Sequence, residues 1–348
     1  MDFRILSNNW LRNVFVLCLS IFCTSVNAIT DDEINRVPLM QKFIQQMVSQ
    51  FRFEEKEVLQ WLHQTQTQPE IIKTISKPLE SKSWTVYRHA FITNARVNAG
   101  ASFWEHQHET LMRAQEQFGI PARITLAILG VETNYGKKQG NYRIPDALAT
   151  LAFYYPSRSE FFFDELKTYM VLARELRMYP FTVKGSYAGA MGQPQFMPTS
   201  YMDYGIDYDG DGRVDLIHST KDSIGSIANY LKMHGWRREQ PIVARISFKK
   251  NNHTNRFVHS YHGKTLTVAR WRALGAQVDP ELSGKLHGRL MAFPIHGHKE
   301  YWLAFNNFDV IMTYNKSPLY AMAVYQLAHE VKQERYARLE LAQHHALV

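Results

Sequence analysis

The sequence is poor in the residues and motifs on which several common kinds of chemistry depend. Its 348 residues include two cysteines, Cys18 and Cys23, and both lie close to the N-terminus. If that segment is removed, the remaining chain can form no disulfide and offers no thiol nucleophile. The sequence also has no HExxH pairing among its 15 histidines and no GxSxG motif. A zincin-type protease and a serine hydrolase therefore have little support.

The N-terminal segment is typical of a secretory signal peptide. Basic residues precede an apolar stretch over residues 14–22, which is too short to cross a membrane as a helix. Val26-Asn-Ala28 fits the small-residue cleavage pattern, so we predict that residues 1–28 are a signal peptide cleaved after Ala28; a retained anchor is the alternative. Cys23 lies in a poor lipobox, because the large Phe22 stands where a small residue is expected. We therefore expect an exported protein without a lipid anchor, associated with a membrane at most peripherally.

The composition allows a sizeable core and favours polyanionic partners. Apolar residues make up 45% of the chain and aromatic residues 13%, and the formal charge is +8. A basic exported protein is attracted to envelope polymers, anionic lipid surfaces or nucleic acid. No basic stripe with interleaved aromatic residues is evident, so nucleic acid is not a predicted partner.

Sequence periodicity predicts a mainly α-helical protein of the α+β class. Helical patterns cover residues 31–80 and 103–118, and Ser159 and Asp222 are predicted to cap two further helices. Strand-like alternation follows over residues 242–248, 256–261 and 266–268, and a helical pattern returns at 320–329. We predict a helical domain and core over 29–236, a small β-rich subdomain over 237–305, and a C-terminal segment over 306–348 that returns to the core.

Glu132 is the most informative residue. It ends an apolar run in which Ile124, Ile128 and Glu132 share one helical face, and Pro121 suits the first residue of that helix. Burial and the negative end of a helix both disfavour a charged carboxylate. A carboxylic acid that holds its proton near neutral pH is what a general acid requires.

The glycine-rich segment 185–198 is the second candidate for a functional site. Its glycines allow close backbone approach, whereas Ser186, Gln193 and Gln195 offer hydrogen bonds to hydroxyl or acetamido groups. Neither the P-loop nor the dinucleotide-binding spacing is present. We predict a wall of a sugar-binding cleft, with a purely structural turn as the alternative.

The segment 207–218 resembles the first half of an EF-hand loop. Aspartates occupy positions 1, 3 and 5, and a glycine occupies position 6, where such loops turn sharply. Position 12, usually a bidentate glutamate, is His218, so the more distant Asp222 is a candidate for the last ligand. We predict a structural calcium ion, with a metal-free turn as the alternative. The predicted ligand residues are Asp207, Asp209, Asp211, Arg213 and Asp222.

The segment 306–320 combines an apolar run with polar residues. A buried strand followed by a capped helix accounts for most of its pattern. Tyr314, Asn315 and Ser317 gather at the predicted turn, where either helix capping or a functional site explains them.

Several of these motifs together resemble the lytic murein transglycosylase B family. They occur in that family's order and cover roughly residues 35–332: residues 130–136 around Glu132, 146–152, 185–192, 195–198, the acidic loop and 314–320. The resemblance implies a lysozyme-like helical core and cleavage of the MurNAc–GlcNAc β-1,4 bond of peptidoglycan, leaving a 1,6-anhydromuramoyl end. It implies that Glu132 is catalytic, and that a glycan cleft is lined by Ser186, Gln195, Tyr314, Asn315 and Tyr320. It also implies calcium binding by the acidic loop and a periplasmic location. Peptidoglycan strands are the implied partner, and proteins of cell-wall synthesis or remodelling are further candidate partners.

A single convincing carboxylate fits a reaction in which the substrate supplies its own nucleophile. Glu132 would then act first as acid and afterwards as base, and the chemistry needs no cofactor. Two other interpretations stay open. A goose-lysozyme-like muramidase would use water positioned by Asp146 or another acid, and a non-catalytic envelope-binding protein would retain the cleft and the acidic loop.

Overall fold

The computed structural model describes residues 27–76, 82–248, 257–259, 261–295 and 297–346. It is mainly α-helical with a five-stranded antiparallel sheet, which confirms the predicted fold class. The predicted signal peptide lies outside the described residues except for Asn27–Ala28, which form strand β1. Within the described residues, no helix combines the length and apolar character needed to span a membrane.

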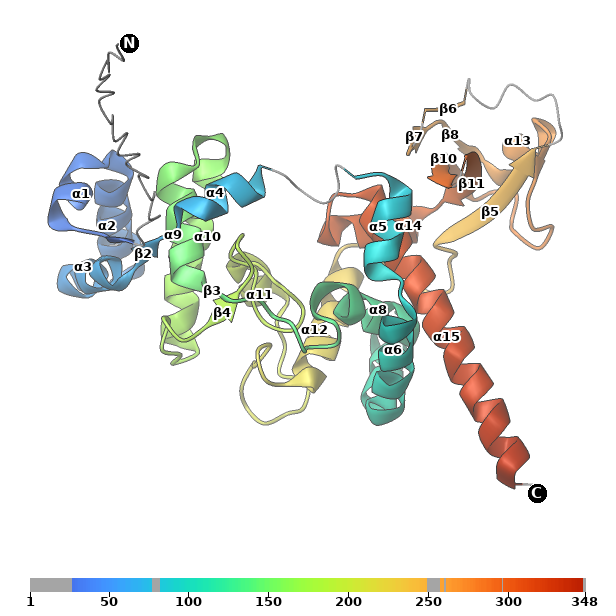
Figure 1. The fold of residues 1–348 in the computed structure, drawn as a ribbon, viewed down its shortest axis with the longest axis horizontal. Helices are drawn as coiled ribbons and strands as arrows, with labels where there is room; N and C mark the ends of the chain where they lie inside the picture. Colours follow the sequence, from blue (N-terminus) through green and yellow to red (C-terminus); the bar gives the residue numbers. More distant parts are fainter. Residues whose placement is uncertain (1–26, 77–81, 249–256, 260, 296, 347–348) are drawn as a thin grey trace, which may run out of the picture.

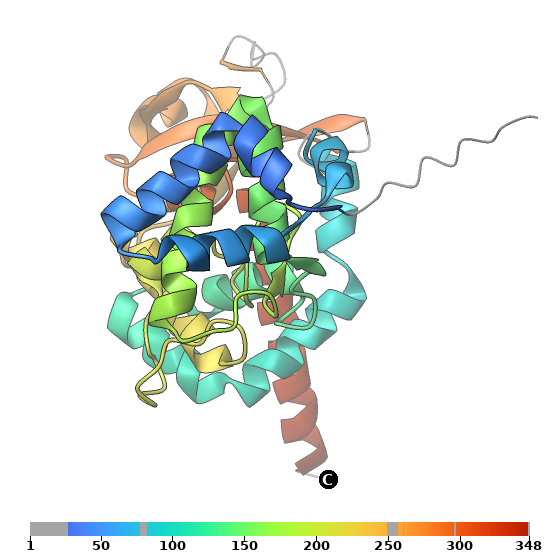
Figure 2. The same ribbon diagram turned by 90° about the vertical axis from the view of Figure 1, so that its left-hand side faces the viewer.

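One group of helices forms the left-hand part of the molecule in Figure 1, and Figure 2 shows α1–α3 in front of α9 and α10. The paired short strands β1 and β2 and the aromatic cluster around Phe43 and Trp61 belong to this group. Its elements are α1 (Asp31–Arg36), α2 (Pro38–Phe51), α3 (Glu55–Gln64), β2 (Gln66–Thr67), α4 (Pro69–Ile75), α9 (Ile144–Tyr154), η2 (Pro156–Arg158) and α10 (Ser159–Glu175).

A second group of helices surrounds α8 (Ala122–Thr133). This helix is buried along almost its whole length and packs against α6, α7, α12 and α15. The other elements are α5 (Trp84–Phe91), α6 (Asn94–His106), α7 (His108–Phe118), α11 (Pro198–Tyr204), α12 (Thr220–Met233), α14 (Asn306–Tyr314) and α15 (Pro318–Ala346), with β3 (Tyr142–Arg143) paired to β4 (Lys184–Gly185).

The five-stranded sheet has the order β8-β10-β11-β5-β9 and lies within the span predicted to be β-rich. Its own core contains Val268, Trp271, Leu290 and Leu303. The alternation at 242–248 corresponds to β5, but β10 and β11 had no predicted counterpart. The elements here are β5 (Val243–Phe248), β6 (Val258–His259), β7 (His262–Gly263), β8 (Thr265–Thr267), α13 (Val268–Ala273), β9 (Ala276–Gln277), β10 (His287–Ile295) and β11 (His298–Ala304).

Three local predictions were wrong. The segment 306–314 is helix α14 and not a strand, because Phe308 and Ile311 are buried at helical spacing. Ser159 is the first residue of α10, whereas Arg158 occupies the N-cap position. Helix α12 is capped by the side chain of Ser219, which accepts the N–H of Asp222, so Asp222 lies in the first turn.

Candidate active site

Glu132 is the penultimate residue of α8 and is partly buried. The apolar residues before it hold the helix in the core, and Asn134 ends the helix in a left-handed conformation with φ 50°. The carboxylate is therefore fixed at the negative end of a rigid helix. Pro121 takes the N-cap position of α8, one residue earlier than the first-residue position expected from the sequence.

Two tyrosines lie beside Glu132. The hydroxyl of Tyr320 donates a hydrogen bond of 2.6 Å to Oε1 of Glu132. The ring of Tyr314 stacks on that of Tyr320, with centroids 6.2 Å apart and an interplanar angle of 10°, and its hydroxyl donates to the carbonyl of Pro194. Burial, followed by the negative charge of Glu132, raises the pKa of both tyrosines well above the ordinary value. Both hydroxyls therefore stay protonated and act as donors at working pH.

The turn between α14 and α15 brings these tyrosines together. Ser317 is 5% exposed, and its hydroxyl accepts the N–H of Tyr320 at 3.4 Å in the first turn of α15. Asn315 lies in this turn beside Tyr314. Ser317 therefore acts as a cap, whereas Tyr314 and Tyr320 lie beside Glu132 at the end of α8.

The segment 185–198 forms a compact loop next to Glu132. Thr133 is fully buried; its hydroxyl accepts the N–H of Gly136 and donates to the carbonyl of Gln193 at 2.8 Å. The sequence motif contained Thr133, but no role was predicted for it, although its position directly after Glu132 is the signal that could have suggested one. Gly192, with φ 73°, admits no side chain, because a Cβ would lie 2.5 Å from the carbonyl oxygen of Leu216.

The three predicted polar residues of this loop differ in their surroundings. Gln193 is 5% exposed, and its amide binds the carbonyl of His218 and the hydroxyl of Thr220, so here it supports the loop. Gln195 is partly exposed with φ 54°, and its Nε2 donates to the carbonyls of Gln139 and Gly192. Ser186 is partly exposed, and its oxygen accepts N–H groups within the loop.

The acidic loop has the arrangement expected of a cation site. Ligand oxygens of Asp207, Asp209 and Asp211 lie within 4.8 Å of one another. Asp207 also accepts three backbone N–H groups of the loop, which fixes the turn. Carboxylates in this arrangement suit a hard cation such as calcium, and Arg213 occupies the seventh position, from which EF-hand loops use a backbone carbonyl.

Asp222 does not join this carboxylate cluster, contrary to the sequence prediction. It is 1% exposed and accepts the backbone N–H groups of Tyr208, Asp209 and Asp215. Burial raises its pKa, although these three donors oppose the shift. Asp222 therefore supports the loop from α12.

Asp215 and His218 occupy the end of the loop. Burial opposes ionisation of Asp215, but hydrogen bonds from the N–H groups of His218 and Ile217 and from the His218 ring hold its pKa below the usual value. These contacts turn Asp215 toward its own segment. His218, at the twelfth position, is exposed and pairs with Asp215 at 3.0 Å.

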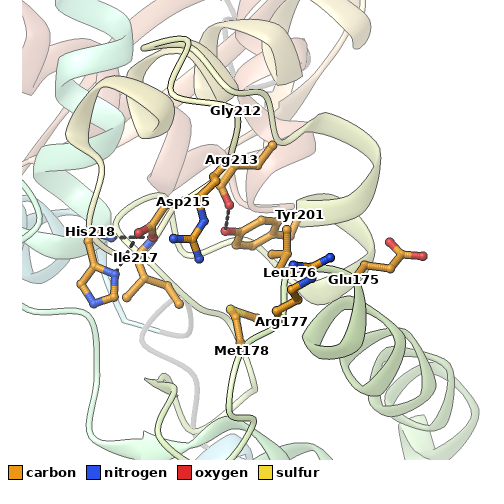
Figure 3. Close-up of a pocket in the computed structure, with 11 residues that line it drawn as sticks. Glu175, Leu176, Arg177, Met178, Tyr201, Gly212, Arg213, Asp215, Ile217 and His218 are labelled. Atoms are coloured by element: carbon orange, nitrogen blue, oxygen red, sulfur yellow. Dashed lines mark hydrogen bonds and ion pairs between the residues drawn. The ribbon is translucent and has the colours of Figure 1, made fainter.

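A cavity of about 970 Å³ lies between the acidic loop and the end of α10 (Figure 3). Glu132 is not among its lining residues, so it is distinct from the carboxylate site. Its lining residues are Glu175, Leu176, Arg177, Met178, Tyr201, Gly212, Arg213, Val214, Asp215, Ile217 and His218.

The carboxylate of Asp146, the acid considered for positioning water, is bound by other groups of the protein. It is 1% exposed, forms a two-pronged ion pair with Arg143 at 2.6 and 2.8 Å, and accepts the N–H of Gln66. Its oxygens join α9 to the strand β2. They are not available to activate a water molecule.

The chain is similar in sequence and in structure to several known proteins. Residues 36–329 match the family model described as the transglycosylase SLT domain. The chain is 35% identical over 304 residues to the membrane-bound lytic murein transglycosylase B of Escherichia coli K12, covering 84% of this chain and 82% of that protein. Two solved structures are also similar. Soluble lytic transglycosylase SltB1 of Pseudomonas aeruginosa is 39% identical with a TM-score of 0.78, covering 84% of this chain and 98% of that one. Escherichia coli Slt35 in complex with calcium is 34% identical with a TM-score of 0.80, covering 87% and 96%.

Proposed function

Because the chain belongs to the transglycosylase SLT domain family and is a lytic murein transglycosylase acting on peptidoglycan, we propose that it cleaves the MurNAc–GlcNAc bond without water, using Glu132 alone. The observation that carries the proposal is the hydrogen bond from Tyr320 to a carboxylate at the end of a buried helix. A hydrolytic muramidase is the alternative, but its best candidate for a second acid, Asp146, is held by Arg143.

In the proposed reaction, the proton on Glu132 passes to the glycosidic oxygen as the C1–O4 bond breaks. The 2-acetamido group of the muramoyl residue stabilises the positive charge that develops at C1. The Glu132 carboxylate then removes the proton from the C6 hydroxyl of the same sugar as O6 bonds to C1. The proton returns to Glu132, water is not consumed, and the product carries a 1,6-anhydro end.

Tyr320 orients Glu132 through both proton transfers. A hydroxyl that stays protonated can donate to the carboxylate after the first transfer, and this hydrogen bond is charge-assisted. The hydroxyl of Tyr314 donates to the carbonyl of Pro194 in the loop 185–198, and the stacked ring of Tyr314 holds Tyr320 in place. We propose that Ser186, Gln195, Tyr314 and Asn315 contact the glycan strand.

The acidic loop is proposed to hold a calcium ion through Asp207, Asp209 and Asp211, with the backbone carbonyl of Arg213. This proposal is supported by the carboxylate cluster and by the calcium complex solved for Escherichia coli Slt35. The ion would order the loop that supports Gln193. It takes no part in the proton transfers.

Export to the periplasm by a cleaved signal peptide, without a lipid anchor, is proposed from the N-terminal sequence. Peptidoglycan strands are the partner on which the proposal depends. The comparable Escherichia coli protein is described as membrane-bound. Fractionation of cells that express the full chain would separate a soluble periplasmic protein from an anchored one.

The Glu132→Gln variant tests the catalytic assignment. An amide retains the shape of the side chain but cannot exchange a proton, so the variant should bind sacculi and fail to lyse them. Glu160→Gln, at an exposed position of α10, is the matched control and should be fully active. Lysis of purified sacculi by Glu132→Gln at the normal rate would refute the proposed role.

A further inference from the structure

The cavity between the acidic loop and α10 has two walls of different chemistry. Leu176, Met178, Val214 and Ile217 provide an apolar lining. Figure 3 shows Arg213 on the acidic-loop side and Arg177 on the α10 side, while the carboxylate of Glu175 is directed away from the other side chains. The space therefore combines aliphatic surface with two guanidinium groups.

Both guanidinium groups are available to a ligand. Neither Arg177 nor Arg213 forms an ion pair or a side-chain hydrogen bond within the part of the chain that the structure describes. The neighbouring carboxylate of Asp215 is already bound by His218 and by backbone N–H groups. Among the described residues, two guanidinium groups without a carboxylate partner therefore line the cavity, together with the carboxylates of Glu175 and Asp215.

Arg177 is held at its position at an energetic cost. It follows the end of α10 with φ 53°, while the N–H of Met178 donates to the carbonyl of Ala173 at 2.8 Å. This is the position after a helix where glycine is the usual residue, because side chains disfavour the left-handed conformation. A glycine at this position would be less strained. The arginine keeps the strain but places a guanidinium group at the cavity.

Hydrogen bonds join the wall of the cavity to the segment that follows α8 and to the loop 185–198. The carbonyl of Ile217 accepts Nε2 of Gln139 at 2.9 Å, and the carbonyl of His218 accepts Nε2 of Gln193. Gln139 follows α8 and also binds Gln195 through its own carbonyl. The wall of the cavity is thus connected by hydrogen bonds to the loop 185–198 beside Glu132.

We propose that this cavity binds the peptide stems of peptidoglycan, with Arg177 and Arg213 engaging their free carboxylates and the apolar lining contacting their aliphatic side chains. The inference rests on peptidoglycan being the substrate. Guanidinium groups pair with carboxylates through two parallel hydrogen bonds. An acidic peptide can contact both the guanidinium groups and the apolar lining, whereas an inorganic anion can contact the guanidinium groups alone.

The first test is calorimetric titration with N-acetyl-L-alanyl-D-glutamic acid, compared with its uncharged diamide and with inorganic phosphate. We expect binding of the dipeptide and none of the diamide. Arg177→Gly and Arg213→Gln should each weaken binding at least about fivefold, since each removes a charge-assisted contact. Arg177→Gly relieves the backbone strain, and Arg213→Gln keeps the carbonyl of the metal loop, so both variants should fold.

Arg52→Gly is the matched control, because Arg52 is another exposed arginine with positive φ, 57°, at the end of α2. It should bind the dipeptide as the parent does. Absence of dipeptide binding, equal binding by the Arg177→Gly and Arg213→Gln variants, or equal affinity for phosphate would each overturn the proposal.

A second readout uses the active enzyme on long strands. The ratio of kcat/KM for peptide-bearing strands to that for strands stripped of peptides should fall at least about fivefold in Arg177→Gly. An unchanged ratio would count against the site. Because calorimetry requires no turnover, failure of the proposed lytic mechanism would leave peptide binding measurable, and loss of peptide binding would leave the chemistry at Glu132 intact.

Discussion

The hydroxyl of Tyr320 lies 2.6 Å from Oε1 of Glu132, and its removal is the sharpest perturbation of the site. Tyr320→Phe keeps the aromatic ring and its stacking on Tyr314 but leaves one carboxylate oxygen without its donor. A hydrogen bond to a charged group contributes about 1.5–3 kcal/mol. If the bond acts during the reaction, kcat should fall by about 10- to 160-fold.

The same change should alter the pH profile. A tyrosine hydroxyl donates to the ionised form of Glu132, so its loss favours the protonated form. The alkaline limb of the profile, along which Glu132 loses the proton that it must donate, should therefore move to higher pH in Tyr320→Phe. Burial keeps the tyrosine itself protonated, because it raises the pKa of Tyr320 well above its ordinary value. The tyrosine contributes no titration of its own below alkaline pH.

Turbidimetric lysis of sacculi across pH, with thermal melting as a check on folding, measures both effects. Tyr325→Phe is the matched control, since Tyr325 lies in the same helix and packs at an edge against Trp302. It should keep its activity. Unchanged kcat and an unchanged pH profile in a folded Tyr320→Phe variant would refute the role assigned to this hydrogen bond.

Three further predictions concern the acidic loop. Asp222→Asn should lower the free energy of unfolding by about 1–3 kcal/mol, because an amide cannot accept all the backbone N–H groups that the carboxylate accepts; a melting temperature equal to that of the exposed-site variant Asp203→Asn would contradict this. Asp215 has a lowered pKa, so its contribution to stability is present above its unfolded pKa and is lost as pH falls through the folded value. The melting temperature of Asp215→Asn should thus lie below the parent's at pH 7 and converge with it in acid, whereas a constant gap would argue against the stabilising role of the hydrogen bonds to Asp215. Calcium at about 100 times its Kd should stabilise the parent by about 2.7 kcal/mol and Asp209→Asn much less; identical melting with calcium and with chelator would count against the metal site.

Glu132 and its hydrogen-bond partner Tyr320 were both singled out from the sequence, but their contact could not be predicted. Glu132 was identified because a carboxylate at the end of an apolar helix is unusual. Tyr320 entered through family resemblance, and it is 188 positions away in the chain. The turn that joins α14 to α15 makes the contact, and the sequence pattern had favoured a strand in place of α14.

The acidic loop shows the same limit. The spacing of Asp207, Asp209 and Asp211 predicted their cluster, because ligands of such a loop are local in sequence. Asp222 was predicted as a further ligand, yet it turns its oxygens to backbone N–H groups of the loop. Its orientation depends on how α12 packs, which residue spacing does not encode. Gln193 was likewise assigned to the cleft, whereas burial directs its amide toward His218 and Thr220.

Mass spectrometry of the products released from purified peptidoglycan in ¹⁸O-labelled water tests the central claim most directly. If Glu132 performs both proton transfers on the sugar's own C6 hydroxyl, the muramoyl ends should be lighter than reducing ends by one water and should carry no ¹⁸O. Reducing muramoyl ends that contain ¹⁸O would contradict the account and identify the enzyme as a hydrolytic muramidase.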